Sequence, residues 1–262
     1  MSTPVPADSP QLSPATSPPL AIVTGGSRGL GYEVARGLAA KGYHLALVAQ
    51  NENGLAEARA KILHDFPGIL VTTHPIDCDV SKPGQIERVR QQLVELKSQL
   101  ATPSALVIAH GVMSEKMSKT MRTTDHEWRR VLAINLDSVF MFVNELVPAM
   151  ADARHGRVVI FSACLGRMSG PGNAGGLAPY RISKAGVNAL VRNLSHETGQ
   201  GSRGFLVDAI CPNHSRTDMG GPDAPRSAEE GAATAIWLAT REFEAGKDQT
   251  GLFWEDQTVI PW

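Results

Sequence analysis

The sequence has little cysteine, and the arrangement of its cysteines argues against two kinds of protein. Cys78, Cys164 and Cys211 are an odd number, lie far apart and match no metal-ligand spacing. A disulfide-stapled scaffold and a cysteine-based metal centre are therefore not indicated, and we expect no metal. Scattered cysteines of this kind are typical of reduced thiols, so we expect a cytoplasmic protein.

The sequence also lacks an excess of charge of either sign, and it lacks long apolar runs. The 25 Lys and Arg residues are balanced by 26 Asp and Glu residues, which leaves a formal net charge of −1. This balance gives no electrostatic reason to expect a nucleic acid or a membrane surface as a partner. No apolar run reaches the ~18 residues that a membrane span needs, so we expect no transmembrane helix.

The first nineteen residues lack the composition of a folded segment. They contain six prolines and six Ser or Thr residues, and Asp8 is their one charged side chain. Because they have neither a basic start nor an apolar stretch, they do not resemble a signal peptide. We expect residues 1–18 to form a disordered Pro/Ser-rich tail, with a partner-binding segment as the alternative. Residues 19–262 are expected to form one domain.

From residue 20 onward, short apolar runs alternate with longer helical patterns. Strands are expected at 20–24, 44–49, 69–77, 105–109, 157–162 and 205–210, with an edge strand at 252–253. Helices are expected up to residue 41 and at 55–66, 83–100, 124–150, 179–198 and 228–240. This alternation predicts an α/β fold, a single Rossmann-type doubly wound parallel sheet with helices on both faces.

A glycine-rich loop joins the first expected strand to the first expected helix. Gly25 permits a tight turn, and Gly29 and Gly31 let the backbone approach a pyrophosphate at the start of the helix. The strand–turn–helix context is the one that a dinucleotide-binding loop requires. An ordinary turn between strand and helix is the alternative.

Tyr180 and Lys184 lie four residues apart at the start of the helix expected at 179–198. This spacing places a phenol and an ammonium on one face of the helix. A neighbouring cation favours the phenolate and lowers the pKa of a tyrosine. Such a tyrosine can exchange a proton with a ketone or an alcohol near neutral pH. The alternative is a buried capping tyrosine beside a solvated lysine.

These motifs together resemble the short-chain dehydrogenase/reductase family over about residues 20–262. The residues that carry the resemblance are Thr24–Gly31, Asp79 with Val80, Asn135, and Tyr180 with Lys184. The C-terminal segments, among them 217–222 and 237–239, are similar to the carbonyl-reductase-like members. The resemblance implies reduction of a small ketone or aldehyde, with NADPH as the cofactor.

The resemblance also implies a role for each site residue. Tyr180 would be the general acid, Lys184 would lower its pKa and bind the nicotinamide ribose, and Asn135 would hold a water in a proton relay. Further cofactor-binding residues implied are Gly25, Ser27, Arg28, Gly29, Leu30, Gly31, Asp79, Val80, Gly111, Pro212 and Thr217. Asp79 would accept from the adenine amine, and Thr217 would lie near the carboxamide.

The choice of NADPH over NADH depends on two positions. NAD-specific members usually carry an acid at the end of the second strand, where this chain has Ala49-Gln50-Asn51. Arg28 matches the arginine that NADP-preferring members turn toward the 2′-phosphate, which guanidinium binds through paired donors. A second arginine, common in such members, is replaced by Gln50.

Three positions depart from the family pattern. The serine that usually assists the tyrosine is replaced by Ala163, which leaves Ser162 as the nearest candidate and Ser183 and Ser169 as others. Ile108, Ala109 and His110 stand where the family has two asparagines and an alanine. His110 is interpreted as a structural histidine. Asn213 follows Pro212 in place of glycine, and asparagine tolerates a left-handed backbone.

The departures leave two alternatives to a carbonyl reductase. One is a non-redox reaction on the same scaffold, such as isomerisation, dehydration or cyclisation, and the other is a dinucleotide-binding sensor. We further expect a homo-oligomer formed through the helical stretches around 128–147 and 185–194. Four methionines are candidates for lining an apolar substrate mouth, with ordinary core positions as the alternative: Met113, Met117, Met121 and Met168.

Overall fold

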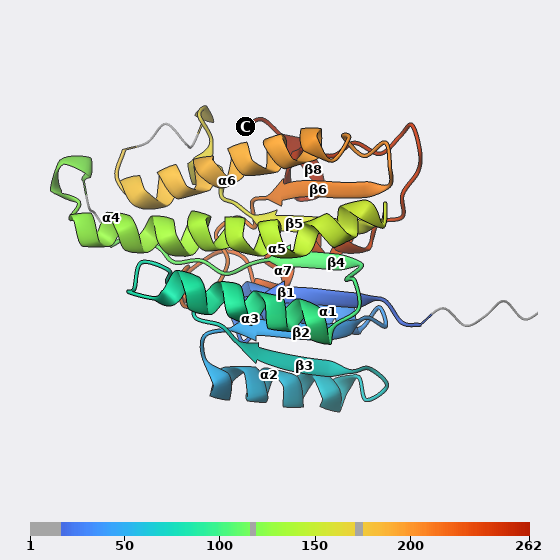
Figure 1. Cartoon of the computed structure of the whole chain (residues 1–262). Coiled ribbons are helices and arrows are strands. Elements are labelled where there is room, and N and C mark those ends of the chain that lie inside the picture. Colours follow the sequence, from blue (N-terminus) through green and yellow to red (C-terminus); the bar gives the residue numbers. More distant parts are fainter. Residues whose placement is uncertain (1–16, 116–118, 171–174) are drawn as a thin grey trace, which may run out of the picture.

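A computed structural model describes residues 17–115, 119–170 and 175–262 of the chain (Figure 1). Residues 1–16 of the expected tail lie outside the described residues, as does Met117. The disorder of the tail and the boundary near residue 18 therefore stay predictions.

Eight strands form one sheet in the described part of the chain, in the order β3-β2-β1-β4-β5-β6-β7-β8. All neighbouring strands are parallel except β8, which runs antiparallel to β7. The strands are β1 (Leu20–Thr24), β2 (His44–Ala49), β3 (Val71–Pro75), β4 (Ala105–Ile108), β5 (Gly156–Phe161), β6 (Phe205–Ile210), β7 (Phe253–Glu255) and β8 (Thr258–Ile260). Every residue of β4, β5 and β6 is buried, because helices cover both faces of a parallel sheet.

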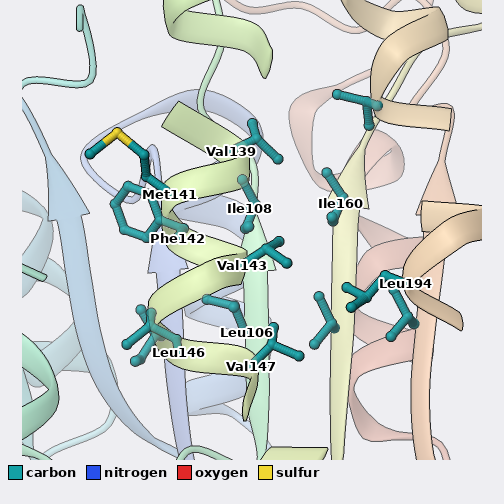
Figure 2. Close-up of a cluster of buried hydrophobic side chains, with 14 of the residues drawn as sticks. Leu106, Ile108, Val139, Met141, Phe142, Val143, Leu146, Val147, Ile160 and Leu194 are labelled. Carbon is teal, nitrogen blue, oxygen red and sulfur yellow. The ribbon is translucent and has the colours of Figure 1, made fainter. Parts of the chain in front are cut away.

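The helices divide into two layers, which confirms the doubly wound arrangement. They are α1 (Gly29–Ala39), α2 (Glu52–Asp65), α3 (Gln85–Gln99), α4 (Asp125–Leu132), α5 (Ser138–Asp152), α6 (Ala178–Glu197) and α7 (Ala228–Thr240). One buried cluster joins α3, α5 and α6 to one face of the sheet, and a second joins α1, α2 and α7 to the other. Figure 2 shows part of the first cluster, in which Val143 of α5 lies beside Ile108 and Leu106 of β4.

Two differences from the expected elements have physical causes. The single helix expected at 124–150 is divided by a π-helical turn at Ala133–Asp137, which separates α4 from α5. The strand β8 was not expected, because the tight turn before it uses Asp256 and Gln257 in left-handed conformation (φ 50° and 58°). Such turns normally carry glycine or asparagine, so no hairpin signal is present at these positions.

The continuous helical stretch Asp125–Asp152 is long and apolar enough to cross a membrane, by length and composition alone. Its most apolar window has a mean hydropathy of 1.4, and half of that window is buried inside the molecule. Phe142 and Leu146 are almost fully enclosed, as in the core helix of a soluble protein. We therefore interpret the stretch as a core helix of the α/β fold.

Candidate active site

A cleft of about 940 Å³ opens at the carboxyl ends of the strands. It extends from the loop after β2 across β1 to the loop after β4, where the strand order reverses. Ligands of open α/β sheets bind at this switch point. We call it the glycine-loop cleft. Nine of the expected cofactor-binding residues line it: Gly25, Ser27, Arg28, Gly29, Leu30, Gly31, Asp79, Gly111 and Thr217.

The floor of the cleft can be built only with glycine at two positions. Gly25 has φ +68°, and a Cβ there would lie 3.1 Å from the His110 nitrogen. A Cβ on Gly31 would lie 2.2 Å from the Gly25 carbonyl oxygen, which is a severe overlap. Arg28 begins α1 without a side-chain cap, so the first N–H groups of the helix are available to an anion. This cradle fits a pyrophosphate.

Arg28 is paired with another residue of the chain at the mouth of the cleft. Its guanidinium forms an ion pair with Asp218, and both side chains are exposed, at 78% and 72%. Asp218 directly follows Thr217, whose methyl group lies 3.2 Å from where a Cβ on Gly29 would be. The glycine loop and the loop after β6 therefore meet over the cleft. No sequence motif indicates Asp218 as the partner of Arg28.

Asp79 and Val80 differ in their placement relative to the cleft. Asp79 lines the cleft, and its carboxylate accepts hydrogen bonds from the Ser81 hydroxyl (2.5 Å) and the Ser81 N–H (3.3 Å). Val80 is 6% exposed and packs in the core beneath α3 and α5. Its side chain is not among those that line the cleft, so the expected contact of Val80 with the cofactor is not indicated.

Tyr180 and Lys184 are both buried on α6, at 6% and 4% exposure. The Lys184 ammonium lies 5.9 Å from the centroid of the Tyr180 ring and donates to the Phe161 carbonyl (2.7 Å). Burial lowers the pKa of Lys184 to about 8. Burial raises the pKa of Tyr180, with smaller contributions from the sulfurs of Cys211 and Cys164. The direction is opposite to the lowering expected from Lys184, because desolvation of the phenolate is the largest influence on the phenol.

Asn135 lies on the π-helical turn and is fully buried. Its side chain accepts from the Val112 N–H (2.8 Å) and donates to the Val112 carbonyl (2.9 Å) and to the Ser183 hydroxyl (3.1 Å). A Cβ on Gly111 would lie 3.2 Å from the Asn135 Oδ1 and 3.6 Å from the Lys184 Nζ. The glycine thus lets the three residues converge, and the water relay stays a prediction.

A small apolar group, which we call the Tyr180 cluster, surrounds the tyrosine. It contains Val131, Ala163 and Tyr180, with Val112, Met113, Leu165 and Leu177 packed against them. Ala163 thus shares the surroundings of Tyr180, as the resemblance implied. Val112 belongs to this cluster and also lines the glycine-loop cleft, so the two regions adjoin.

The structure does not bring the Ser162 hydroxyl into the Tyr180 cluster. Ser162 is 3% exposed and donates to the Asn188 Oδ1 (2.5 Å), with a longer contact to the Lys184 carbonyl (3.3 Å). The Ser183 hydroxyl donates to the Tyr180 carbonyl (2.7 Å). Ser169 is exposed near the C-terminus, 3.5 Å from the Trp262 carbonyl. Each of the three serine hydroxyls that the sequence offered therefore has another partner.

Ser114 is a residue that the sequence analysis missed. It is 3% exposed, and its hydroxyl accepts the Tyr180 N–H (2.9 Å) across 66 positions of sequence. It thereby caps the first turn of α6 and positions the tyrosine. Its separation from Tyr180 in the sequence left no local signal.

His110 is a structural residue, as interpreted. Its ring shares hydrogen bonds with the Thr24 hydroxyl (2.7 Å) and the Ser138 hydroxyl (2.8 Å). Burial, and then the charge of Lys184, lowers its pKa to about 3, so the ring stays neutral. The ring connects β1 with α5 and supplies the tie between elements that Ile108 cannot make.

The loop after β6 follows the expectations in part. Asn213 has φ 58°, the left-handed conformation that asparagine tolerates. Thr217 lines the cleft and accepts the Gly220 N–H (3.1 Å). Pro212 lies outside the lining of the cleft, and its carbonyl accepts the Ser215 hydroxyl (3.0 Å). Across the described ranges, no group of three His, Cys, Asp or Glu residues is placed to hold a metal ion.

Comparison with known proteins identifies the same family that the sequence motifs resemble and the same fold. The family model described as short chain dehydrogenase matches residues 19–227. The 3-oxoacyl-[acyl-carrier-protein] reductase FabG of Escherichia coli K12 is 33% identical over 200 residues, which cover 76% of this chain and 75% of that protein. The enzyme of the same name from Staphylococcus epidermidis is 31% identical over 199 residues, with 76% of each covered.

Solved structures match over more of the chain at lower identity. A short chain dehydrogenase of Escherichia coli CFT073, complexed with NADPH, has a TM-score of 0.77 at 19% identity, covering 92% of this chain and 97% of that one. One from Salmonella enterica serovar Typhi has a TM-score of 0.77 at 21% identity, covering 92% and 96%. At these identities the likeness concerns the fold.

Proposed function

Because the chain belongs to the short-chain dehydrogenase/reductase family, we propose that it is an oxidoreductase that reduces a ketone or aldehyde with NADPH. The observation that carries the proposal is the convergence of Lys184, Asn135 and Gly111 on the helix that bears Tyr180, next to a cleft whose glycines fit a pyrophosphate. NADPH, when bound, supplies the hydride. The residues of the chain supply binding, orientation and the proton.

Tyr180 is the proposed proton donor. Because burial raises its pKa, the phenol stays protonated at neutral pH, which suits donation to a carbonyl oxygen better than abstraction from an alcohol. The Phe161 carbonyl holds the Lys184 ammonium at the same helix face. Asn135 fixes the Val112 backbone, and with it the wall between the glycine-loop cleft and the Tyr180 cluster.

The class of substrate follows from the surroundings of Tyr180. The side chains packed on the tyrosine are apolar, so we propose an apolar carbonyl compound as the substrate. The curated relatives are named as reductases of 3-oxoacyl groups, which are also ketones. Met113 belongs to the Tyr180 cluster, but Met121 and Met168 are 93% and 80% exposed and line no buried mouth.

The preference for NADPH is proposed from Arg28. The two residues directly after β2 are Gln50 and Asn51, neither of them an acid, and Arg28 lies within the glycine loop itself. Its pairing with Asp218 has to give way to the 2′-phosphate. Both side chains are exposed, and an exposed ion pair contributes only ~0–1 kcal/mol, so the exchange is accessible.

We also place the protein in the cytoplasm as a homo-oligomer, without a nucleic acid or membrane partner. Support for self-association comes from apolar side chains on the outer faces of α4, α5 and α6. Trp128, Phe140 and Ile182 are 36%, 51% and 45% exposed. Phe140 lines a second, shallower hollow with Ile86 and Leu190.

A second candidate function is favoured by Ala163. An alanine in the Tyr180 cluster leaves the carbonyl oxygen one hydroxyl donor short, and an isomerisation, dehydration or cyclisation does not need that donor. A dinucleotide-binding sensor is the non-enzymatic alternative.

Loss of NADPH absorbance with a panel of carbonyl compounds tests the reductase, the non-redox enzyme and the sensor against one another. Conversion without NADPH consumption supports the non-redox reaction, and tight NADPH binding without conversion supports the sensor.

A further inference from the structure

Two of the three cysteines lie together at the carboxyl end of the sheet. Cys211 directly follows β6, and Cys164 lies three residues beyond the end of β5. The two strands are paired up to Phe161 and Ile210, and the Ser162 N–H extends the pairing by donating to the Ile210 carbonyl (2.8 Å). The sheet therefore fixes two cysteines that are 47 positions apart in the sequence.

The cysteines are in direct contact. The Cys164 N–H donates to the Cys211 sulfur at 3.1 Å, and the Cys211 thiol also lies 4.0 Å from the Asn213 Oδ1. Cys211 is 2% exposed, whereas Cys164 is half-buried and is the one that a solute reaches first. One sulfur is thus accessible and the other waits behind it, which is the arrangement of an attacking and a resolving cysteine.

The contact divides the reactivity of the two thiols. The Cys211 thiol, acting as a donor to the Cys164 sulfur, lowers the pKa of Cys164, and the same interaction together with burial raises the pKa of Cys211. Cys164 is therefore the more readily ionised of the two thiols, and the thiolate is the nucleophile. Cys78 is the contrasting case, because burial raises its pKa to about 12.

We propose that Cys164 and Cys211 form a redox-active pair that hydrogen peroxide converts reversibly into a disulfide beside Tyr180. The Cys164 thiolate attacks one peroxide oxygen, the O–O bond breaks, and hydroxide leaves and is protonated to water. This leaves a sulfenic acid on Cys164. The Cys211 sulfur attacks the Cys164 sulfur, the S–O bond breaks, and the S–S bond forms. The hydroxide released takes up the Cys211 thiol proton as a second water, and a dithiol reductant reverses the oxidation.

The cysteine pair lies next to the Tyr180 cluster. Cys164 directly follows Ala163, and both sulfurs influence the pKa of Tyr180. A disulfide would hold the backbone at the position that faces the tyrosine. Formation of this disulfide requires the two thiols alone, whatever reaction the site catalyses.

The test treats the reduced full-length protein with hydrogen peroxide, quenches it, and counts thiols after unfolding. The protein has three cysteines, so the count should fall from three to one, and peptide mapping should find Cys164 joined to Cys211. Dithiothreitol should restore the count to three. In the folded, reduced protein, iodoacetamide should alkylate Cys164 before Cys78.

Two variants make the result specific. Cys78→Ser should still form the disulfide, so its count should fall from two to none. Cys164→Ser should form no disulfide within the chain and keep both remaining thiols. The inference is overturned if the oxidised wild type keeps three thiols, if it joins either cysteine to Cys78, or if Cys164 passes to a sulfinic acid while Cys211 stays free.

Discussion

The glycine-loop cleft and the Tyr180 cluster adjoin at Val112, but they are built from different parts of the chain. Backbone shapes the cleft, where Gly25 and Gly31 pack against main-chain atoms, and Arg28 and Asp218 at its mouth are exposed. Side chains shape the Tyr180 cluster, which is apolar and closed. The first region therefore depends on the absence of side chains, and the second depends on the identity of each one.

This difference bears on one departure of the chain from its family, the alanine at position 163. The cleft keeps the glycine pattern, because a Cβ at Gly31 cannot be accommodated. Around Tyr180 the usual serine is Ala163, and two cysteines lie at the neighbouring strand ends. A site shaped by side chains can change its chemistry one residue at a time, whereas a site shaped by backbone cannot.

The largest effect is expected from a Cβ in the cleft. Gly31→Ala places an atom 2.2 Å from the Gly25 carbonyl oxygen. Overpacking of this kind costs about 1–3 kcal/mol of the free energy of unfolding, and displacement of the loop should remove NADPH binding. Gly68→Ala is the matched control, because nothing lies within 4 Å of its Cβ position. Calorimetric titration and thermal unfolding measure both, and normal NADPH binding by Gly31→Ala would contradict the backbone account.

The next effect concerns the alanine in the Tyr180 cluster. Loss of one preorganised donor typically costs ~10²–10³ in rate, so Ala163→Ser should raise turnover on ketones toward that factor. Ser162→Ala should instead lower the free energy of unfolding by about 1–3 kcal/mol, because it leaves the buried Asn188 Oδ1 without its donor. A collapse of turnover in Ser162→Ala, with stability unchanged, would make Ser162 the missing donor.

A smaller effect is expected at the exposed mouth of the cleft. Arg28→Ala should reduce the preference for NADPH over NADH by about 10-fold, since a charged hydrogen bond contributes ~1.5–3 kcal/mol. Asp218→Asn is the counterpart, because it frees the guanidinium and should strengthen NADPH binding slightly. The dissociation constants of the wild type and both variants for NADPH and NADH measure these changes. Equal losses for NADPH and NADH in Arg28→Ala would show that Arg28 does not contact the phosphate.

The smallest effect is a pH dependence that only the buried region should show. Burial lowers the pKa of Lys184 from 10.5 to about 8, so the unfolded chain binds more protons there between these values. The free energy of unfolding should therefore gain a contribution that rises with pH from about 8. The raised pKa of Tyr180 acts oppositely above its ordinary value of 10.0, so the window lies below that pH. Denaturant titrations across this pH window should show no such rise in the Lys184→Met variant. If the free energy of unfolding of that variant rises with pH as steeply as in the wild type, the prediction is contradicted.

The sequence predicted most of the sheet because its signals are local. The runs at Leu20–Thr24, His44–Ala49 and Phe205–Ile210 became strands with those bounds, since each is a buried apolar run. The helix Ala228–Thr240 also begins and ends as expected, and a capping box at Ser227 fixes its start. The π-helical turn at Ala133–Asp137 has no comparable signal, because apolar periodicity continues through it.

Within the candidate site, sequence motifs located residues but did not give their environment. Tyr180 and Lys184 were expected to couple electrostatically, yet burial controls both, and burial depends on distant packing. The contacts of Ser114 with Tyr180 and of Cys164 with Cys211 join segments 66 and 47 positions apart. Such contacts are set by strand order and loop paths, which a single sequence does not reveal.

The most direct test of the account is carbonyl reduction by Tyr180→Phe. The variant keeps the ring that fills the Tyr180 cluster and removes the proposed proton donor alone. We expect reduction to fall by about 10²–10⁴-fold, the usual contribution of a general acid, while NADPH affinity stays within a few-fold of the wild type. Reduction at a rate near that of the wild type, with NADPH consumed, would contradict the central claim.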